Sequence, residues 1–204
     1  MTQSTMFEKA LNDFLTLWVT VEPIGTLILF ASLSGAMTRA QRRSVAGKAV
    51  GYSAVILLGS IVVGQALLGA MNIQLISFQI AGGLILLLFA LQMVFGISYG
   101  ASARPEKGHD IAVFPLAVPS IAGAEAIMAV VLLTDNQVYP VGTQLVTALM
   151  VVLVLAITYG LMLLAEPILK VIGFNGAAVL ERVTGVVLAA LAIDFILQAV
   201  GWTR

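Results

Sequence analysis

The stretch LWVTVEPIGTLILF, residues 17–30, places a glutamate and a proline inside an apolar run long enough to cross a bilayer. An ionisable side chain in such a run costs about 2.5–3.5 kcal/mol on insertion scales. A proline removes a helical hydrogen bond, in a medium that has no water to replace it. Glu22 and Pro23 therefore indicate a membrane helix that is interrupted for a purpose.

The composition is that of a membrane protein. Of the 204 residues, 60% are hydrophobic and 10% are charged, whereas soluble domains carry about 25% charged residues. Ten Lys and Arg balance ten Asp and Glu, which gives no attraction to nucleic acid. The chain has no cysteine, which excludes disulfides, thiol catalysis and Cys-ligated metals. The N-terminus lacks the basic region of a cleavable signal, so we expect the first span to be retained.

Apolar runs of about 17–25 residues cross a bilayer as helices, and the sequence contains six such runs. We expect a single all-α integral membrane domain over 1–204, because no separator is long enough to fold by itself. The predicted transmembrane helices cover residues 14–36, 50–69, 78–98, 112–133, 146–166 and 183–202.

The positive charges predict the orientation, because Lys and Arg are held on the cytoplasmic side. Only Lys9 and Arg204 fall on the opposite side, so both termini are predicted to be extracytoplasmic. The other eight basic residues lie in the separators within 37–49, 99–111 and 167–182: Arg39, Arg42, Arg43, Lys48, Arg104, Lys107, Lys170 and Arg182.

The two halves of the chain show traces of a repeat. An alignment at an offset of 102 residues pairs GLILLLFALQM with GVVLAALAIDF; at 101, Glu22-Pro23 falls opposite Gly123-Ala124. Because three spans per half is an odd number, a duplicated half must be inverted. We therefore expect a 3+3 inverted repeat, with repeat A at about 12–100 and repeat B at about 110–204. The aligned pairs are Gly83 with Gly185, Ala90 with Ala192, and Gln92 with Asp194.

A second interruption is expected in span 4, where FPLAVPSIAGAEAI covers residues 114–127. Pro115, Pro119 and Gly123 stand four residues apart and so share one helix face. A single proline kink would be unremarkable in a membrane helix. Two breaks in matching spans, each beside a carboxylate, instead favour discontinuous helices 1 and 4 that form a site.

Three acidic residues, Glu22, Glu125 and Asp194, lie well inside their runs, with no basic residue at similar depth. Such residues are candidates for coupling to a proton or a sodium ion. The alternative is a neutral acid that bonds to a neighbouring helix. Glu166, beside Pro167 and Lys170, is interpreted as interfacial instead.

Several other residues could contribute to a site or to packing. Hydroxyl groups at Thr20, Thr26, Ser32, Ser34 and Ser120 could bind a polar ligand, although most such groups bond back to their own helix. The glycines are interpreted as close helix packing; they are Gly59 with Gly64, Gly82 with Gly83, and Gly185. His109 has no metal-spaced partner and is expected to be solvated.

No catalytic or nucleotide-binding motif occurs in the sequence, so we expect neither an enzyme nor a cofactor beyond a coupled proton or sodium ion.

Four segments together resemble the MarC family of bacterial inner-membrane proteins: VEPIGTLILF, IAGGLILLLFALQM, FPLAVPSIAGAEAI and ERVTGVVLAALAIDFI. The resemblance covers nearly the whole chain. It implies six spans in an inverted three-plus-three repeat and a relation to amino-acid exporters. Some members are described as cation-coupled transporters of small neutral amino acids such as glycine and alanine.

The resemblance also implies site residues. The family's first motif, Asp or Asn then Pro-x-Gly, falls on Glu22, Pro23 and Gly25. Its second, Pro then Gly-Pro-Gly, falls on Pro119, Gly123, Ala124 and Glu125. The second motif has lost a helix breaker and gained a carboxylate, which puts specificity for glycine or alanine in doubt. The extra acid could favour a cationic substrate, or a proton over sodium.

The leading hypothesis is a secondary transporter of small amino acids or similar metabolites, coupled to a cation, with a proton expected before sodium. Its halves would rock around a site at helices 1 and 4. The alternatives are a non-transporting assembly or stress factor and an ion channel. The expected partners are the lipid bilayer and a small molecule; a homo-oligomer is left open. The expected substrate-binding residues are Glu22, Pro23, Gly25, Thr26, Pro119, Ser120, Gly123, Ala124 and Glu125, with Glu22, Glu125 and Asp194 for the coupling ion.

Overall fold

The computed structural model describes residues 3–96, 110–136 and 138–202, and all regular structure in these ranges is helical. The first half contains α1 (Gln3–Val21), α2 (Pro23–Ser34), α3 (Arg39–Ala70) and α4 (Leu75–Phe95). The second half contains the π-helix η2 (Ala112–Ile121) and then α5 (Ala124–Leu133), α6 (Val141–Leu163) and α7 (Ala165–Ala199).

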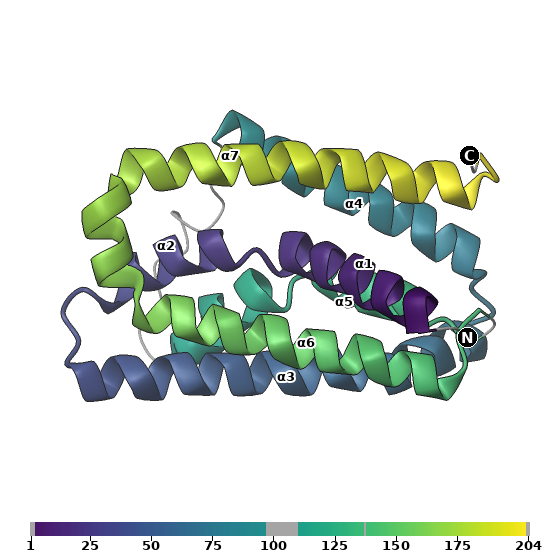
Figure 1. Cartoon of the computed structure of the whole chain (residues 1–204), viewed down its shortest axis with the longest axis horizontal. Helices are drawn as coiled ribbons and strands as arrows, with labels where there is room; N and C mark the ends of the chain where they lie inside the picture. The colour runs from purple at the N-terminus through teal and green to yellow at the C-terminus, as the bar shows by residue number, and fades with distance from the viewer. Residues whose placement is uncertain (1–2, 97–109, 137, 203–204) are drawn as a thin grey trace.

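The helices form a bundle in which short elements lie between long ones. Figure 1 shows α4 and α7 side by side along one face and α3 and α6 along the other, with α1, α2 and α5 between these pairs. One hydrophobic cluster joins α1, α2, α3, η2, α5, α6 and the first part of α7. A second cluster joins α4 and α7 and receives Met128 from α5. The broken segments are therefore packed on both sides by long helices.

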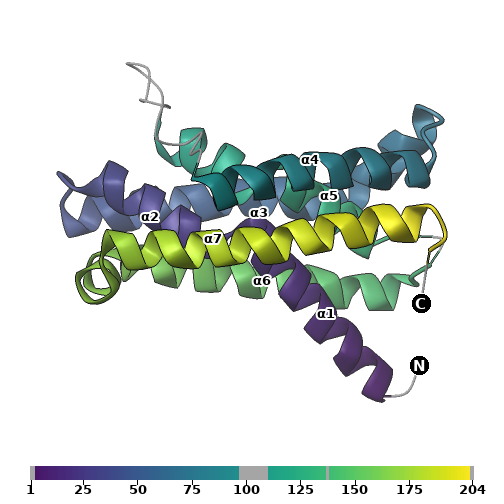
Figure 2. The same ribbon diagram turned by 90° about the horizontal axis from the view of Figure 1, so that it is seen from above.

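Both described ends of the chain lie at the same end of the bundle (Figure 1). Figure 2 shows α1 leaving the bundle at a slant, and α2, which follows it, packs on α6 and α7. The turn between α3 and α4 lies at the end that holds the termini, and the connection from α2 to α3 lies at the other. We call these the terminal end and the opposite end.

Helices α4 and α7 approach closely through glycines, as the sequence analysis predicted. A Cβ atom on Gly83 would lie 3.1 Å from the carbonyl oxygen of Ala192, and one on Gly185 would lie 3.1 Å from that of Ala90. Gly82 is covered by the side chain of Met128. The packing interpretation is confirmed for these glycines, because a larger residue would push the helices apart.

At Gly59 the packing interpretation is wrong. A Cβ atom there would meet nothing within 4 Å, whereas one on Gly64 would meet Val131 of α5. The pair does not form a small-residue stripe against one neighbouring helix.

The all-helical membrane class is confirmed. Four helices in the described ranges are long and apolar enough to cross a membrane, and η2 with α5 can form a fifth span that bends by 52°. Most of the sixth expected run, 183–202, lies in α7, which ends at Ala199 and is not among these candidate spans. A break at Gly173 (φ 71°, ψ 164°) divides α7. The long helices also expose many large apolar side chains, as expected of surfaces that face lipid.

Two predicted separators prove to be helical. Residues 39–48 form the first turns of α3, and 170–182 lie inside α7 apart from Gly173. The start of α3 is fixed by a capping box, in which Thr38 Oγ1 accepts from the Gln41 N–H and Gln41 Oε1 accepts from the Thr38 N–H. Arg, Lys, Gln and Ala are good helix formers, so the helix continues beyond the apolar run.

Candidate functional site

The first helix break is confined to Glu22, between α1 and α2. Glu22 has φ 52° and ψ 62°, a left-handed conformation that costs a residue with a Cβ atom about 1–2 kcal/mol. Pro23 starts α2, where its missing N–H leaves no helical bond unmade. Span 1 is thus interrupted where the sequence predicted, with Gly25 inside the second helix and not at the break.

The side chain of Glu22 folds back over the first turn of α2. Its Oε1 and Oε2 atoms lie 2.6 and 3.1 Å from the position that a Cβ atom on Gly25 would occupy. A larger residue at position 25 would have to displace this carboxyl group. Gly25 therefore makes room for Glu22 at the helix start.

The second break has the same position in its own half. Helix α5 begins at Ala124 with Gly123 as its N-cap, and α2 begins at Pro23 with Glu22 as its N-cap. The two helix starts are 124 − 23 = 101 residues apart, which is the offset at which the sequence aligned these dipeptides.

The prolines before the second break disturb η2 from within. Phe114 (φ −129°, ψ 124°) and Val118 (φ −130°, ψ 125°) both have extended backbone. Each directly precedes a proline, Pro115 or Pro119, and this position disfavours the helical conformation. Pro119 thus acts ahead of the break, and the chain turns into α5 at Ala122 and Gly123.

Glu125 is buried, with 6% of its surface exposed, in the first turn of α5. Its carboxyl group accepts a hydrogen bond from its own backbone N–H, and it lies where a Cβ atom on Gly123 would stand. Each half-helix start is therefore covered by a carboxyl group that belongs to the chain itself.

A polar contact joins the two broken spans. The hydroxyl oxygens of Thr26 in α2 and Ser120 in η2 lie 3.0 Å apart, and Thr26 Oγ1 also lies 3.4 Å from the Ser120 carbonyl oxygen. Thr26 is buried, with 1% exposed. The structure thus brings together the residues that the two sequence motifs placed far apart in the chain.

Glu22 is buried without a full set of partners. It is 7% exposed, and its Oε1 atom has no hydrogen-bond donor within residues 3–96, 110–136 and 138–202. The charges that act on its carboxyl group come from Glu125 on α5 and Glu181 on α7. Among the described residues, no ion pair joins a basic side chain to Glu22 or Glu125, and no three Asp, Glu or His side chains there are grouped to hold a metal ion.

Asp194 is not brought to the breaks. It is exposed on α7 and accepts a hydrogen bond of 2.7 Å from Gln198 Nε2. Thr20 and Ser32 donate to carbonyl groups of their own helices, at Thr16 and Ile28, as most membrane hydroxyls do. Ser34 uses its carbonyl oxygen, which accepts from Arg42 Nε. His109 lies outside the described residues.

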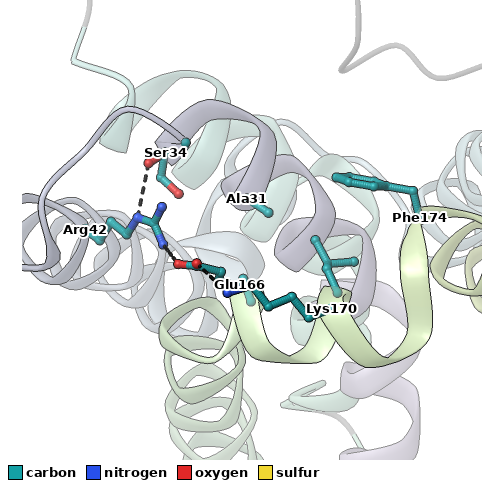
Figure 3. A pocket seen from close by; sticks show the side chains of 9 residues that line it. Ala31, Ser34, Arg42, Glu166, Lys170 and Phe174 are labelled. Atoms are coloured by element: carbon teal, nitrogen blue, oxygen red, sulfur yellow. Dashed lines mark hydrogen bonds and ion pairs between the residues drawn. The ribbon is translucent and has the colours of Figure 1, made fainter.

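A separate pocket of about 260 Å³ opens at the opposite end of the bundle (Figure 3). Glu166 bridges two basic side chains there, with Lys170 Nζ at 3.0 Å and Arg42 Nη1 at 2.8 Å. Lys170 first and then Arg42 hold the pKa of Glu166 below its ordinary value. The exposed, paired position agrees with the interfacial interpretation of Glu166.

The terminal end holds a buried ion pair that sequence reasoning missed. Lys9 Nζ lies 2.9 Å from both carboxylate oxygens of Asp13, which is fully buried, and donates to the Leu133 carbonyl at 3.2 Å. Thr147 Oγ1 donates to Asp13 Oδ2 at 2.6 Å. The contacts join α1 to α6 and to the end of α5. The spacing of Lys9 and Asp13 by four residues was the available signal.

Glu181 was also missed, because it lay in a segment taken for a loop. It stands one helical turn before Gly185, which faces α4 from the same helix. A spacing of four residues would have placed both on one face of α7.

Comparison with known proteins agrees with the architecture. Residues 7–202 match the family described as MarC family integral membrane protein. The chain belongs to the MarC family. No solved structure matches it.

Relatives of this MarC-family chain cover almost its whole length. It is 33% identical over 192 residues to the UPF0056 membrane protein MJ1677 of Methanocaldococcus jannaschii, which covers 92% of this chain and 93% of that protein. It is 27% identical over 180 residues to the UPF0056 inner membrane protein YhgN of Escherichia coli strain K12, at 88% and 90% coverage. The resemblance stated from the motifs is confirmed, and the relative's name supports an inner-membrane location.

Proposed function

We propose that this protein is a secondary transporter of small amino acids or similar small metabolites, with its substrate site at the breaks of spans 1 and 4. The observation that carries the proposal is the meeting of two helix breaks, each with a buried carboxyl group and linked by the Thr26–Ser120 contact. Backbone at membrane depth leaves its helix only beside protein or a polar cavity. Interrupted helices that meet in this way are how many secondary transporters build a binding site.

Two relationships support an inverted 3+3 repeat, whose two halves would move against each other during transport. Gly83 packs on the Ala192 carbonyl while Gly185 packs on the Ala90 carbonyl, and the aligned pairs are Gly83 with Gly185 and Ala90 with Ala192. A twofold axis between α4 and α7 would produce such a reciprocal pair. The two half-helices also start at equivalent positions. In the proposed arrangement α7 supplies the sixth span.

In this proposal Glu22 couples transport to a proton. A carboxyl group without a basic partner is neutral when it holds a proton and charged when the proton leaves, and burial makes the charged form costly. If the site faces each side of the membrane in turn, Glu22 exchanges its proton with each side. The two termini are proposed to face the periplasm, as the positive charges indicate.

The closed state of the site also favours a transporter over a channel. Glu22 and Glu125 are both more than nine-tenths buried, as expected when a substrate site is shut off from water between two access states. A continuously open pore would keep such groups wet.

Uptake by proteoliposomes tests the proposal. Purified protein would be reconstituted and screened with labelled amino acids and small amines, with a proton or a sodium gradient imposed. A transporter gives saturable uptake that follows one gradient. A channel gives flux that does not saturate, and an assembly factor gives no flux above empty liposomes; either result would contradict the proposal.

A further inference from the structure

At the two breaks, the N-termini of α2 and α5 are each covered by an acidic side chain, which is unusual. The start of a helix carries a partial positive charge and free N–H groups, which suit an anion. In transporters with broken helices this end points at anionic groups of the substrate. Here the Glu22 carboxyl group covers the first turn of α2, and the Glu125 carboxyl group covers that of α5.

The two positions are closed to a substrate carboxylate by charge as well as by space. Glu22 and Glu125 are both buried, and among the described residues no ion pair joins a basic side chain to either carboxyl group. Arg182 acts on Glu181 from the neighbouring position, which leaves Glu22 and Glu125 as the pair without a counter-charge. A substrate carboxylate added here would be repelled by groups that are held in place.

The group that the site lacks is a donor. Glu22 Oε1 is buried and has no hydrogen-bond partner among the residues that the structure describes, and a buried acceptor left unpaired destabilises the protein, more so when it is charged. An ammonium group offers three N–H donors and a positive charge. It would donate a hydrogen bond to Oε1 and pair with the carboxylate that forms when Glu22 loses its proton.

We propose that Glu22 and Glu125 bind the ammonium group of a small amine that carries no carboxylate, and that the amine displaces a proton from the pair. This inference deepens the transporter proposed above and rests on it for the transport step. In the exchange, an O–H bond of Glu22 breaks, its proton passes to water, and the ammonium ion takes its place without a covalent bond. One monovalent amine thus releases one proton, and the net charge of the site is unchanged.

Binding is tested with two ligands that differ only in whether they carry a carboxylate. Alanine and alaninamide share the ammonium group and the methyl side chain, and ethylamine serves as a smaller amine. The full chain with Trp202→Phe leaves Trp18 as its one tryptophan, and the Trp18 carbonyl oxygen lies 3.3 Å from the Glu22 backbone nitrogen. Trp18 fluorescence reports binding, and a pH dye in weak buffer reports proton release.

We expect both amines to give saturable fluorescence changes with proton release. Alanine should bind at least roughly tenfold more weakly than alaninamide, as for loss of a hydrogen-bonded charged pair. Alanine that binds as tightly as alaninamide would overturn the inference. So would the absence of binding by all three compounds.

Variants of the two glutamates test which carboxyl group releases the proton. Glu22→Gln keeps an acceptor oxygen and should still bind alaninamide, but without proton release. Glu125→Gln should weaken the binding of alaninamide roughly tenfold. Glu8→Gln is the matched control, because Glu8 is exposed on α1, and it should behave as the parent. Proton release that survives in Glu22→Gln would overturn the assignment, and Glu125→Gln, which keeps Glu22, should still release a proton when alaninamide binds.

Transport assays separate this inference from the proposed function. Uptake of labelled alanine without any binding of amines would contradict the amine site and leave a transporter. Amine binding with proton release, but with no flux of any tested compound in liposomes, would contradict the transporter and leave the site.

Discussion

The hydroxyl oxygens of Thr26 and Ser120 lie 3.0 Å apart, although 94 residues separate them in the chain. Thr26 stands one turn after the first break, and Ser120 stands just before the second. The contact therefore holds the two breaks at the same depth in the bundle, which places Glu22 and Glu125 within range of each other's charge.

This contact predicts a cross-link. The chain has no cysteine, so Thr26→Cys with Ser120→Cys introduces the only two thiols. We expect a short thiol cross-linker to join them within one chain, which a shift in gel mobility would show. The control is Ser32→Cys with Ser120→Cys, because Ser32 lies six residues, or about 9 Å, further along α2. Equal cross-linking of both pairs would argue against the contact.

The glycines beside the carboxyl groups predict a steric effect. Gly25→Ala should displace the Glu22 carboxyl group and lower the free energy of unfolding by about 1–3 kcal/mol, as overpacking does. Substrate-dependent Trp18 fluorescence should weaken as well. Gly59→Ala is the control, because a Cβ atom there meets nothing within 4 Å. It should be neutral or stabilise α3 by up to about 1 kcal/mol. Thermal unfolding in detergent measures both changes, and a Gly25→Ala protein as stable as Gly59→Ala would contradict the account.

The buried pair at the terminal end predicts a large loss of stability. Asp13→Ala leaves Lys9 buried without its partner, and such losses cost about 3–5 kcal/mol. Lys48→Ala breaks the exposed pair of Lys48 and Asp110, at 3.2 Å, and should cost no more than about 1 kcal/mol. Unfolding midpoints in detergent test the difference. A similar small loss for both variants would show that the Asp13 network does not stabilise the fold.

The orientation is tested by a single thiol. Arg43→Cys lies near the start of α3, at the opposite end from the termini, and we expect it to face the cytoplasm. An impermeant thiol reagent added to intact cells should leave it unlabelled, and the same reagent should label it in inverted vesicles. Val138→Cys, in the connection before α6, should give the reverse pattern. Labelling of Arg43→Cys from outside would show that the protein has the opposite orientation in the membrane.

Helix breaks could be predicted from the sequence more accurately than helix ends. Glu22-Pro23 predicted a break over Glu22–Gly25, because a proline inside a helix removes a hydrogen bond and an acid in an apolar run is costly. The structure confines the break to Glu22. The prolines and the glycine of FPLAVPSIAGAEAI predicted the second break, and the 101-residue offset agreed with it. The ends of α3 and α7 could not be read from hydropathy, because a helix continues past the membrane wherever its residues favour helix.

Side-chain positions around the axis of a helix were harder to predict. Asp194 looked as deep in its run as Glu22, yet it lies on the exposed face of α7 and bonds to Gln198. Glu181 lay in an apparent loop, yet its charge acts on Glu22. Depth in a run depends on sequence position alone, whereas the face of a helix that turns inward depends on its neighbours.

The central claim is tested most directly by gradient-driven accumulation in liposomes that contain Glu22→Gln, with labelled alanine and labelled ethylamine as probes. The variant cannot release a proton at position 22 but keeps the size and an acceptor oxygen of the side chain. The account predicts that it still exchanges the transported probe across the membrane and fails to concentrate it against a gradient, while Glu8→Gln accumulates it as the parent does. Accumulation by Glu22→Gln equal to that of the parent would contradict the account, because the buried glutamate at the break would then have no part in coupling.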